Sequence, residues 1–436
     1  MEIRKRSRLL ICACFLAAAL LPGCGSSSQT TAIPSTVSVF YQHGVFFRNH
    51  TTMTVGYNAF GQLGDGNGKL ASRATAAVVP GLGHMDGCAA GAEHTLVFSN
   101  NSSVMAWGYN SHGQLGNSTV AIGATSSTSD FSDKPVRVGS LTHVTSVAAG
   151  NYHSLAVSGG RVWSWGYNVF GQLGVGNTND ASTPVEVLNG TVSFFSNATQ
   201  VAAGTYHSLA RMTDGTVWAW GDNTYGQLGA NTGALKYSSS PLKVVFLGTD
   251  AKVVQIAAAG SYSLALMDDG TVWAWGHNGV GQLGFAANGL TPNPTPSQVK
   301  IVDPANPNGI LKIDQISAGT GHVLARVGVT VWGWGYNERG QLGNNPSVGG
   351  DTSPNTFVPV QTLIGGSSAI GSGSPMTGVV EVQAFGNSSL AKWKKDPAAK
   401  QEEMWGWGEN SFGQIGAPTV TTGIGYLLVP VPVAGF

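Results

Sequence analysis

A ten-residue pattern, Trp-Gly-x-Asn-x-x-Gly-Gln-Leu-Gly, recurs seven times along this chain of 436 residues. Between the asparagines, successive copies are 52 to 73 residues apart. Repetition at such a period is typical of propellers and solenoids, in which one repeat cannot bury its apolar face alone. Seven copies in a ring would bury the apolar faces of all the repeats and leave little sheet edge exposed. The pattern therefore predicts one seven-bladed β-propeller. The copies begin at Val55, which replaces the tryptophan, and at Trp107, Trp165, Trp220, Trp275, Trp334 and Trp407.

Each copy also contains short strand-like segments joined by turns. In the fourth copy, residues 201–204 lead into 207–210, and the turn 213–215 leads into 216–220. A Pro-Val-x-Val segment such as 184–187 follows the decapeptide after a loop. Short strands separated by glycine turns indicate antiparallel sheets.

The residue types of the decapeptide have physical reasons. The tryptophan can fill the gap between neighbouring sheets, where its burial is worth a few kcal/mol. The asparagine and glutamine amides can satisfy loop backbone groups that no strand pairing reaches. The glycines allow a turn too tight for a Cβ atom.

These motifs resemble those of the regulator of chromosome condensation (RCC1) repeat family. The marks are Ala-Gly-x-x-His-Ser-Leu-Ala at 203–210, Val-Trp-x-Trp-Gly at 217–221 and Gly-Gln-Leu-Gly at 226–229. The resemblance covers residues 37–436 and implies an all-β, seven-bladed propeller of four-stranded antiparallel blades. The first copy is degenerate around Gln42 and His43, and residues 429–431 match the strand that would complete the last blade. The way in which the ring closes stays open.

The first 36 residues predict export. Four basic residues precede an apolar run of 13 residues at 9–21, which is too short to span a bilayer comfortably and fits a signal peptide. Residues 21–24, Leu-Pro-Gly-Cys, resemble the bacterial lipobox, which implies cleavage before Cys24 and acylation of its thiol. A plain secretory signal is the alternative. We therefore expect a signal peptide at 1–23, a lipid-anchored flexible tether at 24–36 and the propeller at 37–436.

The mature chain would be nearly neutral. Residues 1–23 hold four of the 22 basic residues and one of the 22 acids, so their removal leaves three more acids than bases. Such a balance argues against nucleic acid as a partner. Cys88 is the only thiol of the expected propeller domain, which excludes a disulfide within it, and we expect a small buried hydrophobe there.

Five histidines share one repeat position, with Tyr262 and Ser388 in the other two copies. Equivalent positions in different blades lie too far apart to ligate one metal ion, so we expect no metal and interpret these histidines as structural groups that bond the backbone. No nucleophile elbow or recurring carboxylate pair appears, which favours a non-catalytic protein without a cofactor. A propeller enzyme built from several blades remains an alternative. The histidines are His43, His94, His153, His207 and His322.

Aromatic residues flank the repeated asparagine. The ring would place them on one face, as a band of aromatics with polar groups that suits an interface, although packing alone is the other interpretation. We add Trp393, because the seventh copy has a longer, charged hairpin at 392–403. In eukaryotic family members an inserted hairpin acts on a small GTPase, but this one lies in a different repeat. The candidates are Tyr57, Phe60, Tyr109, His112, Tyr167, Phe170, Tyr225, Tyr336, Phe412 and Trp393.

The sequence thus predicts a monomeric cell-envelope lipoprotein, at the outer membrane or cell surface, that presents a propeller to an unidentified protein partner. The lipid on Cys24 would hold it to the membrane. An inhibitor of a secreted enzyme is the alternative, since an exported seven-bladed relative of this type inhibits β-lactamase. Guanine-nucleotide exchange, the best-known activity of the family, is less favoured because GTPases are cytosolic.

Overall fold

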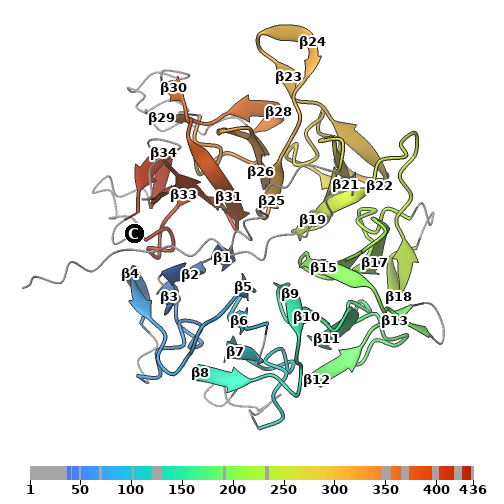
Figure 1. Cartoon of the computed structure of the whole chain (residues 1–436), viewed down its shortest axis with the longest axis vertical. Coiled ribbons are helices and arrows are strands. Elements are labelled where there is room, and N and C mark those ends of the chain that lie inside the picture. The colour runs from blue at the N-terminus through green and yellow to red at the C-terminus, as the bar shows by residue number, and fades with distance from the viewer. Residues whose placement is uncertain are drawn as a thin grey trace, which may run out of the picture.

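The computed structural model describes residues 37–40, 42–48, 51–67, 71–100, 103–119, 130–189, 193–230, 235–344, 355–364, 373–394, 402–416 and 425–433. These residues form strands and turns and contain no helix, so no helix among them could cross a membrane. Seven antiparallel sheets of four strands surround a common centre (Figure 1), which confirms the predicted propeller. Cys24, the expected signal peptide and the expected tether lie outside the described residues.

Each blade consists of four strands that are consecutive in the chain. Blades 1 to 3 contain β1 (Val37–Phe40), β2 (His43–Arg48), β3 (Thr51–Gly56) and β4 (Arg73–Val78); β5 (Gly87–Ala90), β6 (His94–Phe98), β7 (Val104–Tyr109) and β8 (Phe131–Arg137); and β9 (Val144–Ala149), β10 (His153–Ser158), β11 (Arg161–Gly166) and β12 (Ala181–Glu186). Blades 4 and 5 contain β15 (Ala198–Ala203), β16 (His207–Met212), β17 (Val217–Asp222) and β18 (Tyr237–Lys243); and β19 (Val253–Ala259), β20 (Tyr262–Met267), β21 (Val272–Asn278) and β22 (Gly289–Val299). Blades 6 and 7 contain β25 (Gln315–Ala318), β26 (His322–Val327), β27 (Thr330–Gly335) and β28 (Thr356–Gln361); and β31 (Val379–Phe385), β32 (Ser388–Trp393), β33 (Glu403–Glu409) and β34 (Tyr426–Pro432).

Small two-stranded hairpins also connect three pairs of blades. They are β13 (Leu188–Asn189) with β14 (Ser193–Phe194), β23 (Val302–Asp303) with β24 (Asn306–Ile310), and β29 (Leu363–Ile364) with β30 (Ser374–Pro375).

The ring closes by packing between blades 7 and 1, and no strand is exchanged between them. The first strand of every blade lies nearest the centre and contacts the first strands of both neighbours, including β1 with β31. Phe46 and Val55 of blade 1 pack in one cluster with Phe385 and Leu390 of blade 7. Strand β34 completes the last blade, as expected from residues 429–431.

The tryptophan of each decapeptide joins two blades. Trp220 of blade 4 is fully buried, and its Nε1–H donates to the carbonyl oxygen of Gln172 in blade 3 at 2.8 Å. Close approach requires glycine there, because a Cβ atom on Gly174 would lie 2.8 Å from the indole nitrogen of Trp220. Equivalent bonds hold Trp107, Trp165, Trp275, Trp334 and Trp407.

The amides of the decapeptide fold its own turn, as predicted. The Oδ1 atom of Asn168 accepts the N–H of Leu173 at 2.9 Å, and the Oε1 atom of Gln172 accepts the N–H of Phe170 at 2.9 Å. Gly171 and Gly174 have φ values of 74° and 69°, a conformation that favours glycine.

The five histidines are buried and structural, and a backbone hydrogen bond to the next blade acts on four of them, as expected; each also bonds a hydroxyl group of that blade. The Nε2 atom of His207 lies 2.9 Å from Oγ of Ser263 in the next blade. That hydroxyl donates its only proton to the carbonyl of Gln227, also at 2.9 Å, so Nε2 of His207 must carry the donated hydrogen. His43, His94, His153 and His322 bond Thr95, Ser154, Ser208 and Ser389 in the same way.

The exceptions to the histidine position follow from the same bond. Where the next blade offers Val323 instead of a hydroxyl residue, the position holds Tyr262, whose hydroxyl donates to backbone carbonyls of Gly319 and His322. Ser388 holds the histidine position in blade 7, whose next blade in the ring is blade 1. Blade 1 has Gly44 where the other blades have the hydroxyl residue, so Ser388 instead donates to the carbonyl of Glu409 within its own blade. Histidine therefore occurs where a neighbouring hydroxyl can accept its proton.

A second set of contacts joins the inner strands. Gln200 of β15 donates to the carbonyl of Ile256 and accepts its N–H, and Gln255 and Gln315 repeat this with Ile316 and Val382. Blade 7 has Glu381 at this position, opposite Lys392 in the pairing of β31 with β32.

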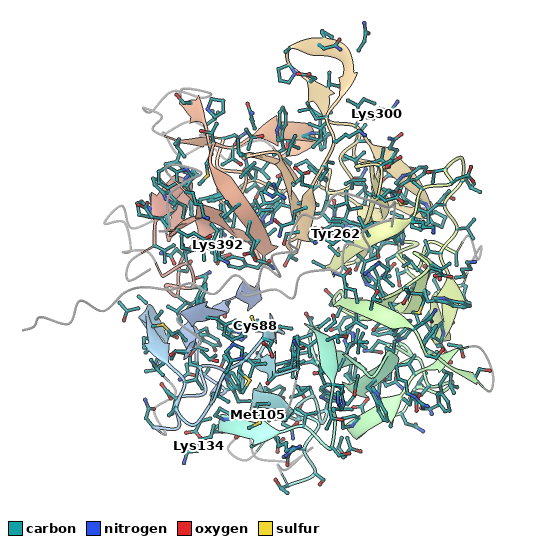
Figure 2. The ribbon with its side chains drawn as sticks, in the orientation of Figure 1. Cys88, Met105, Lys134, Tyr262, Lys300 and Lys392 are labelled. Carbon is teal, nitrogen blue, oxygen red and sulfur yellow. The ribbon has the colours of Figure 1, made fainter. Side chains whose placement is uncertain are left out.

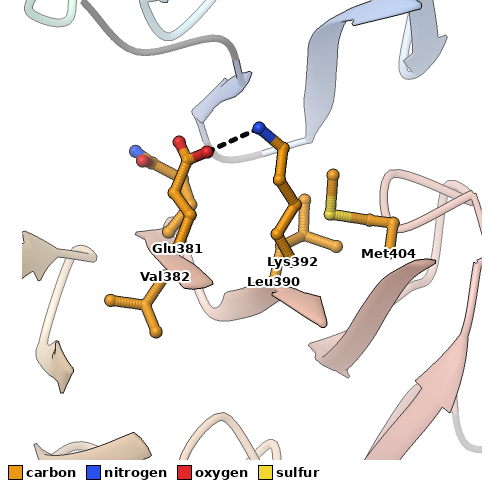
Figure 3. A pocket seen from close by; sticks show the side chains of 6 residues that line it. Glu381, Val382, Leu390, Lys392 and Met404 are labelled. Atoms are coloured by element: carbon orange, nitrogen blue, oxygen red, sulfur yellow. Dashed lines mark hydrogen bonds and ion pairs between the residues drawn. The ribbon is translucent and has the colours of Figure 1, made fainter. Parts of the chain in front are cut away.

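Lys392, the first residue of the charged segment in the seventh hairpin, is buried. Its side chain is 5% exposed, and Nζ lies 2.7 Å from the Glu381 carboxylate, beside Leu390 and Met404 (Figure 3). Cys88 is likewise buried, as predicted, and lies near the centre of the ring (Figure 2), where burial raises the pKa of its thiol well above the ordinary value. Residues 395–401 of the hairpin lie outside the described part of the chain.

Candidate binding face

Three loop positions of each repeat lie together at one end of the blades. The first follows Trp-Gly, the second precedes Gly-Gln, and the third precedes the shared histidine position. Backbone bonds fix the first to the third: in blade 3 the N–H of Tyr167 donates to the carbonyl of Tyr152 at 2.9 Å, and in blade 4 the N–H of Asp222 donates to that of Tyr206 at 2.9 Å. The rigid strand ends therefore set the places of these side chains.

Seven rings at these positions form a continuous series across blades 1 to 4, which we call the aromatic arc. Each successive pair is in contact, with ring centroids 4.5 to 6.1 Å apart. The rings are half-buried, so each one both packs on its neighbours and presents an edge or face to solvent. In order, the aromatic arc contains Phe60, Tyr109, Tyr152, His112, Tyr167, Tyr206 and Phe170.

Five of the ten predicted candidates belong to this arc, and four others lie at equivalent loops. Tyr57 contacts Phe412 across the closure of the ring, at 5.0 Å between centroids. Tyr225 contacts His277, at 4.5 Å. Tyr336 stands apart from the arc in blade 6, and its hydroxyl donates to the Glu338 carboxylate at 3.0 Å.

Trp393 does not join the face. It ends β32 at the hairpin side of blade 7, opposite Glu403 in the strand register, whereas the loop aromatics lie at the other end of the blades. Its indole N–H donates to the carbonyl of Thr377 at 2.5 Å, and its ring packs on Trp405 with centroids 5.6 Å apart. The structure thus separates Trp393 from the other nine candidates.

Sequence reasoning missed Tyr152 and Tyr206, which occupy the third loop position and link neighbouring parts of the arc. Tyr152 contacts Tyr109, His112 and Tyr167, which come from blades 2 and 3. The available signal was their place directly before His153 and His207, at a fixed distance from the repeated tryptophan.

The polar groups of the arc are partly paired. The Nδ1 atom of His112 lies 2.9 Å from Oδ2 of Asp180, and Oδ1 of Asp180 accepts the N–H of Asn168. Partial burial raises the pKa of the Tyr167 hydroxyl, and the charges of Tyr206 and Asp180 raise it further. Burial also raises the pKa of Glu93, the residue of blade 2 at the third loop position.

The residues of this face are of the types that are enriched at protein interfaces. Across the described ranges of the chain, no cluster of three or more His, Cys, Asp or Glu residues could hold a metal ion. Half-buried tyrosine, phenylalanine and histidine rings on a stiff frame provide large contact areas at low cost in side-chain entropy. The fold and this face define a repeat propeller of the kind that serves as a protein-interaction platform.

The family follows from the repeats themselves. The model of the regulator of chromosome condensation (RCC1) repeat matches residues 101–157, 159–211, 214–266 and 269–326, and a second RCC1 repeat model matches 144–172, 198–227 and 253–282. These matches span half of the chain, and the chain belongs to the RCC1 repeat family.

Curated relatives include longer proteins. The chain is 35% identical to the probable E3 ubiquitin-protein ligase HERC6 of Homo sapiens over 59% of its own length and 24% of the relative's. It is 31% identical to the ultraviolet-B receptor UVR8 of Arabidopsis thaliana over 67% of its own length and 62% of the relative's. The chain therefore spans less than two thirds of each of these relatives.

Solved structures share the fold. Human WBSCR16 superposes with a TM-score of 0.69 at 24% identity, covering 83% of this chain and 87% of that chain. Yeast RCC1 (Prp20), crystallised with Kap60, superposes with a TM-score of 0.69 at 18% identity, covering 96% of this chain and 90% of that chain.

Proposed function

We propose that this protein is a cell-envelope lipoprotein whose propeller binds a protein partner through the aromatic arc. The observation that carries this proposal is the arc itself, because seven half-buried rings in unbroken contact exceed what one blade needs for its own packing. Aromatic residues of this kind dominate the energetically important parts of protein interfaces. Membrane attachment at Cys24 rests on the lipobox resemblance of residues 21–24.

The first test removes two rings of the arc. We expect Tyr109→Ala combined with Tyr167→Ala to reduce partner capture at least about tenfold, since each truncated interface tyrosine can cost more than 1 kcal/mol. The measurement is recovery of envelope proteins on the anchored protein, quantified by mass spectrometry. Tyr336→Ala is the matched control, because Tyr336 has the same repeat position but lies outside the arc. Equal capture by the double variant and the wild type would refute the role of the arc.

Stability separates binding from packing. We expect the melting temperature of the double variant to stay within a few degrees of the wild type, because both rings are only half-buried. Unfolding of the double variant would assign the arc to packing.

The second test concerns attachment. Because Cys24 would carry the lipid, Cys24→Ser should move the protein from the membrane fraction to the soluble fraction, as detected by fractionation and immunoblotting. The anchored wild type is the control. Retention of Cys24→Ser in the membrane at the wild-type level would contradict lipid anchoring.

A further inference from the structure

The face that carries the aromatic arc has an excess of acids. Among the residues at its three loop positions, Glu93, Asp222 and Glu409 are acidic and Arg339 alone is basic. Two of these acids have partners within the protein: Asp222 accepts the side-chain amide of Gln227 at 2.7 Å, and Glu409 accepts that of Asn387 at 3.0 Å. Glu93 differs, because within the described residues its carboxylate makes no ion pair or side-chain hydrogen bond.

The repeat defines where Glu93 lies. It occupies the position of Tyr152 and Tyr206, and its carbonyl accepts the N–H of Tyr109 at 2.8 Å, as that of Tyr152 accepts the N–H of Tyr167. The ring of Tyr152 lies between those of Tyr109 and Tyr167, with centroids 6.1 and 6.5 Å away. The backbone bond to Tyr109 therefore places Glu93 beside the Tyr109 loop, towards the blade 1 end of the arc.

The surroundings of Glu93 favour a cation. A half-buried carboxylate has lost part of its hydration, and burial raises its pKa, so a positive charge beside it would recover electrostatic energy. Tyrosine faces attract ammonium and guanidinium groups through the negative charge density of the ring. A phosphate or a carboxylate in the same place would be repelled by Glu93.

We propose that the blade 1 to blade 3 part of the arc recognises a basic segment of a protein partner, with an arginine or lysine side chain paired to Glu93 and stacked on Tyr109. This inference rests on the proposed binding function of the arc and specifies the chemistry of the partner. The tyrosines provide contact area, and Glu93 determines which side chain is accepted there.

The test uses a defined cationic probe, fluorescein-labelled nona-arginine, with nona-serine and nona-glutamate as comparison peptides. Fluorescence anisotropy should show binding of nona-arginine alone. We expect Glu93→Gln to weaken that binding at least about tenfold, because removal of one partner of a desolvated charge pair leaves the other charge unpaired. Tyr109→Leu, which keeps apolar area but removes the ring face, should weaken it by about threefold to tenfold.

A charge-matched control distinguishes recognition from general attraction. Glu338→Gln removes the same charge from an exposed loop of blade 6, where the carboxylate accepts the Tyr336 hydroxyl, and should change the affinity by less than about twofold. A similar loss in Glu93→Gln and Glu338→Gln, no loss in Glu93→Gln, or no binding of nona-arginine to the wild type would each overturn the proposal. Glu93→Gln should keep the wild-type melting temperature or exceed it, since it removes a partly desolvated charge.

The two proposals fail separately. If Tyr109→Ala with Tyr167→Ala loses the natural partner while Glu93→Gln captures it at the wild-type level, the binding face stands and the basic segment is refuted. If both variants capture the partner normally, the binding function of the arc is refuted as well.

Discussion

Acid should unfold this propeller steeply as the pH falls below about 6.5, because five buried histidines cannot be protonated in the folded state. Burial lowers the pKa of His43, His94, His153, His207 and His322 from 6.5 to about 3. The unfolded chain binds these protons near pH 6.5 and the folded chain only near pH 3, so the stability is complete above 6.5 and is lost between 6.5 and 3. Well inside that window, five such groups shift the unfolding equilibrium by about 10⁵-fold per pH unit.

The measurement is the urea midpoint at a series of pH values from 7.5 to 4, followed by circular dichroism. Among the described carboxylates, Glu93 has a pKa that burial raises. Its contribution to the pH dependence has the opposite sign, and it is one group against five. A midpoint that stays constant from pH 7 to pH 4.5 would show that the histidines are accessible to protons in the folded protein.

The molecule itself supplies the control for this pH dependence. At the junction of blades 4 and 5, His207 bonds the hydroxyl of Ser263. At the junction of blades 5 and 6, the same two positions hold Tyr262 and Val323. A double variant, His207→Tyr with Ser263→Val, copies that pair and removes one titrating group. We expect the number of protons taken up on unfolding at pH 4.5 to fall by about one. An unchanged proton uptake would contradict the assignment of the acid sensitivity to these histidines.

The repeat made the architecture predictable from sequence, because each copy contains the same residue types at the same spacing and therefore predicts the same local geometry. The decapeptide combines a tryptophan (valine in the first copy), two amides and glycines at fixed spacing, and a ring of blades buries all six of these tryptophans at once. The closure of the ring was not predictable. The closure depends on which strand of the repeat comes first in each blade. The first copy is degenerate and does not indicate this, whereas the structure shows that Phe46 and Val55 pack on blade 7.

The site was predictable by position but not by contact. Loop residues repeated beside the asparagine do lie on one face, yet the arc needed Tyr152 and Tyr206 from a third position. The hydroxyl partners of the histidines were also not predicted, because each partner lies in the next blade. Ser263, for example, follows Tyr262 in blade 5, but it bonds His207 of blade 4. The burial of Lys392 was not predictable for a related reason: its sequence neighbours are charged, but its strand pairing places it beside Glu381.

Removal of a single decapeptide tryptophan should destabilise the propeller more than any other single truncation of a side chain in its blade. Trp220 is 0% exposed, packs between blades 3 and 4 and donates to the carbonyl of Gln172. We expect Trp220→Ala to lower the free energy of unfolding by about 3 to 5 kcal/mol through lost burial and the cavity left behind. Circular dichroism in urea at pH 7.5, above the histidine window, measures this loss.

Two neighbouring variants divide that loss into its causes. Trp218 lies on the same strand, β17, but its ring is only half-buried and packs on Phe195. We therefore expect Trp218→Ala to lower the free energy of unfolding by less than about 2 kcal/mol. Trp220→Phe keeps an aromatic ring but removes the indole N–H, so the Ser208 hydroxyl is the remaining side-chain donor to the Gln172 carbonyl. We expect this variant to lower the free energy of unfolding by about 1 to 2 kcal/mol. If Trp218→Ala cost as much as Trp220→Ala, the full burial of Trp220 and its hydrogen bond to blade 3 would have no special weight.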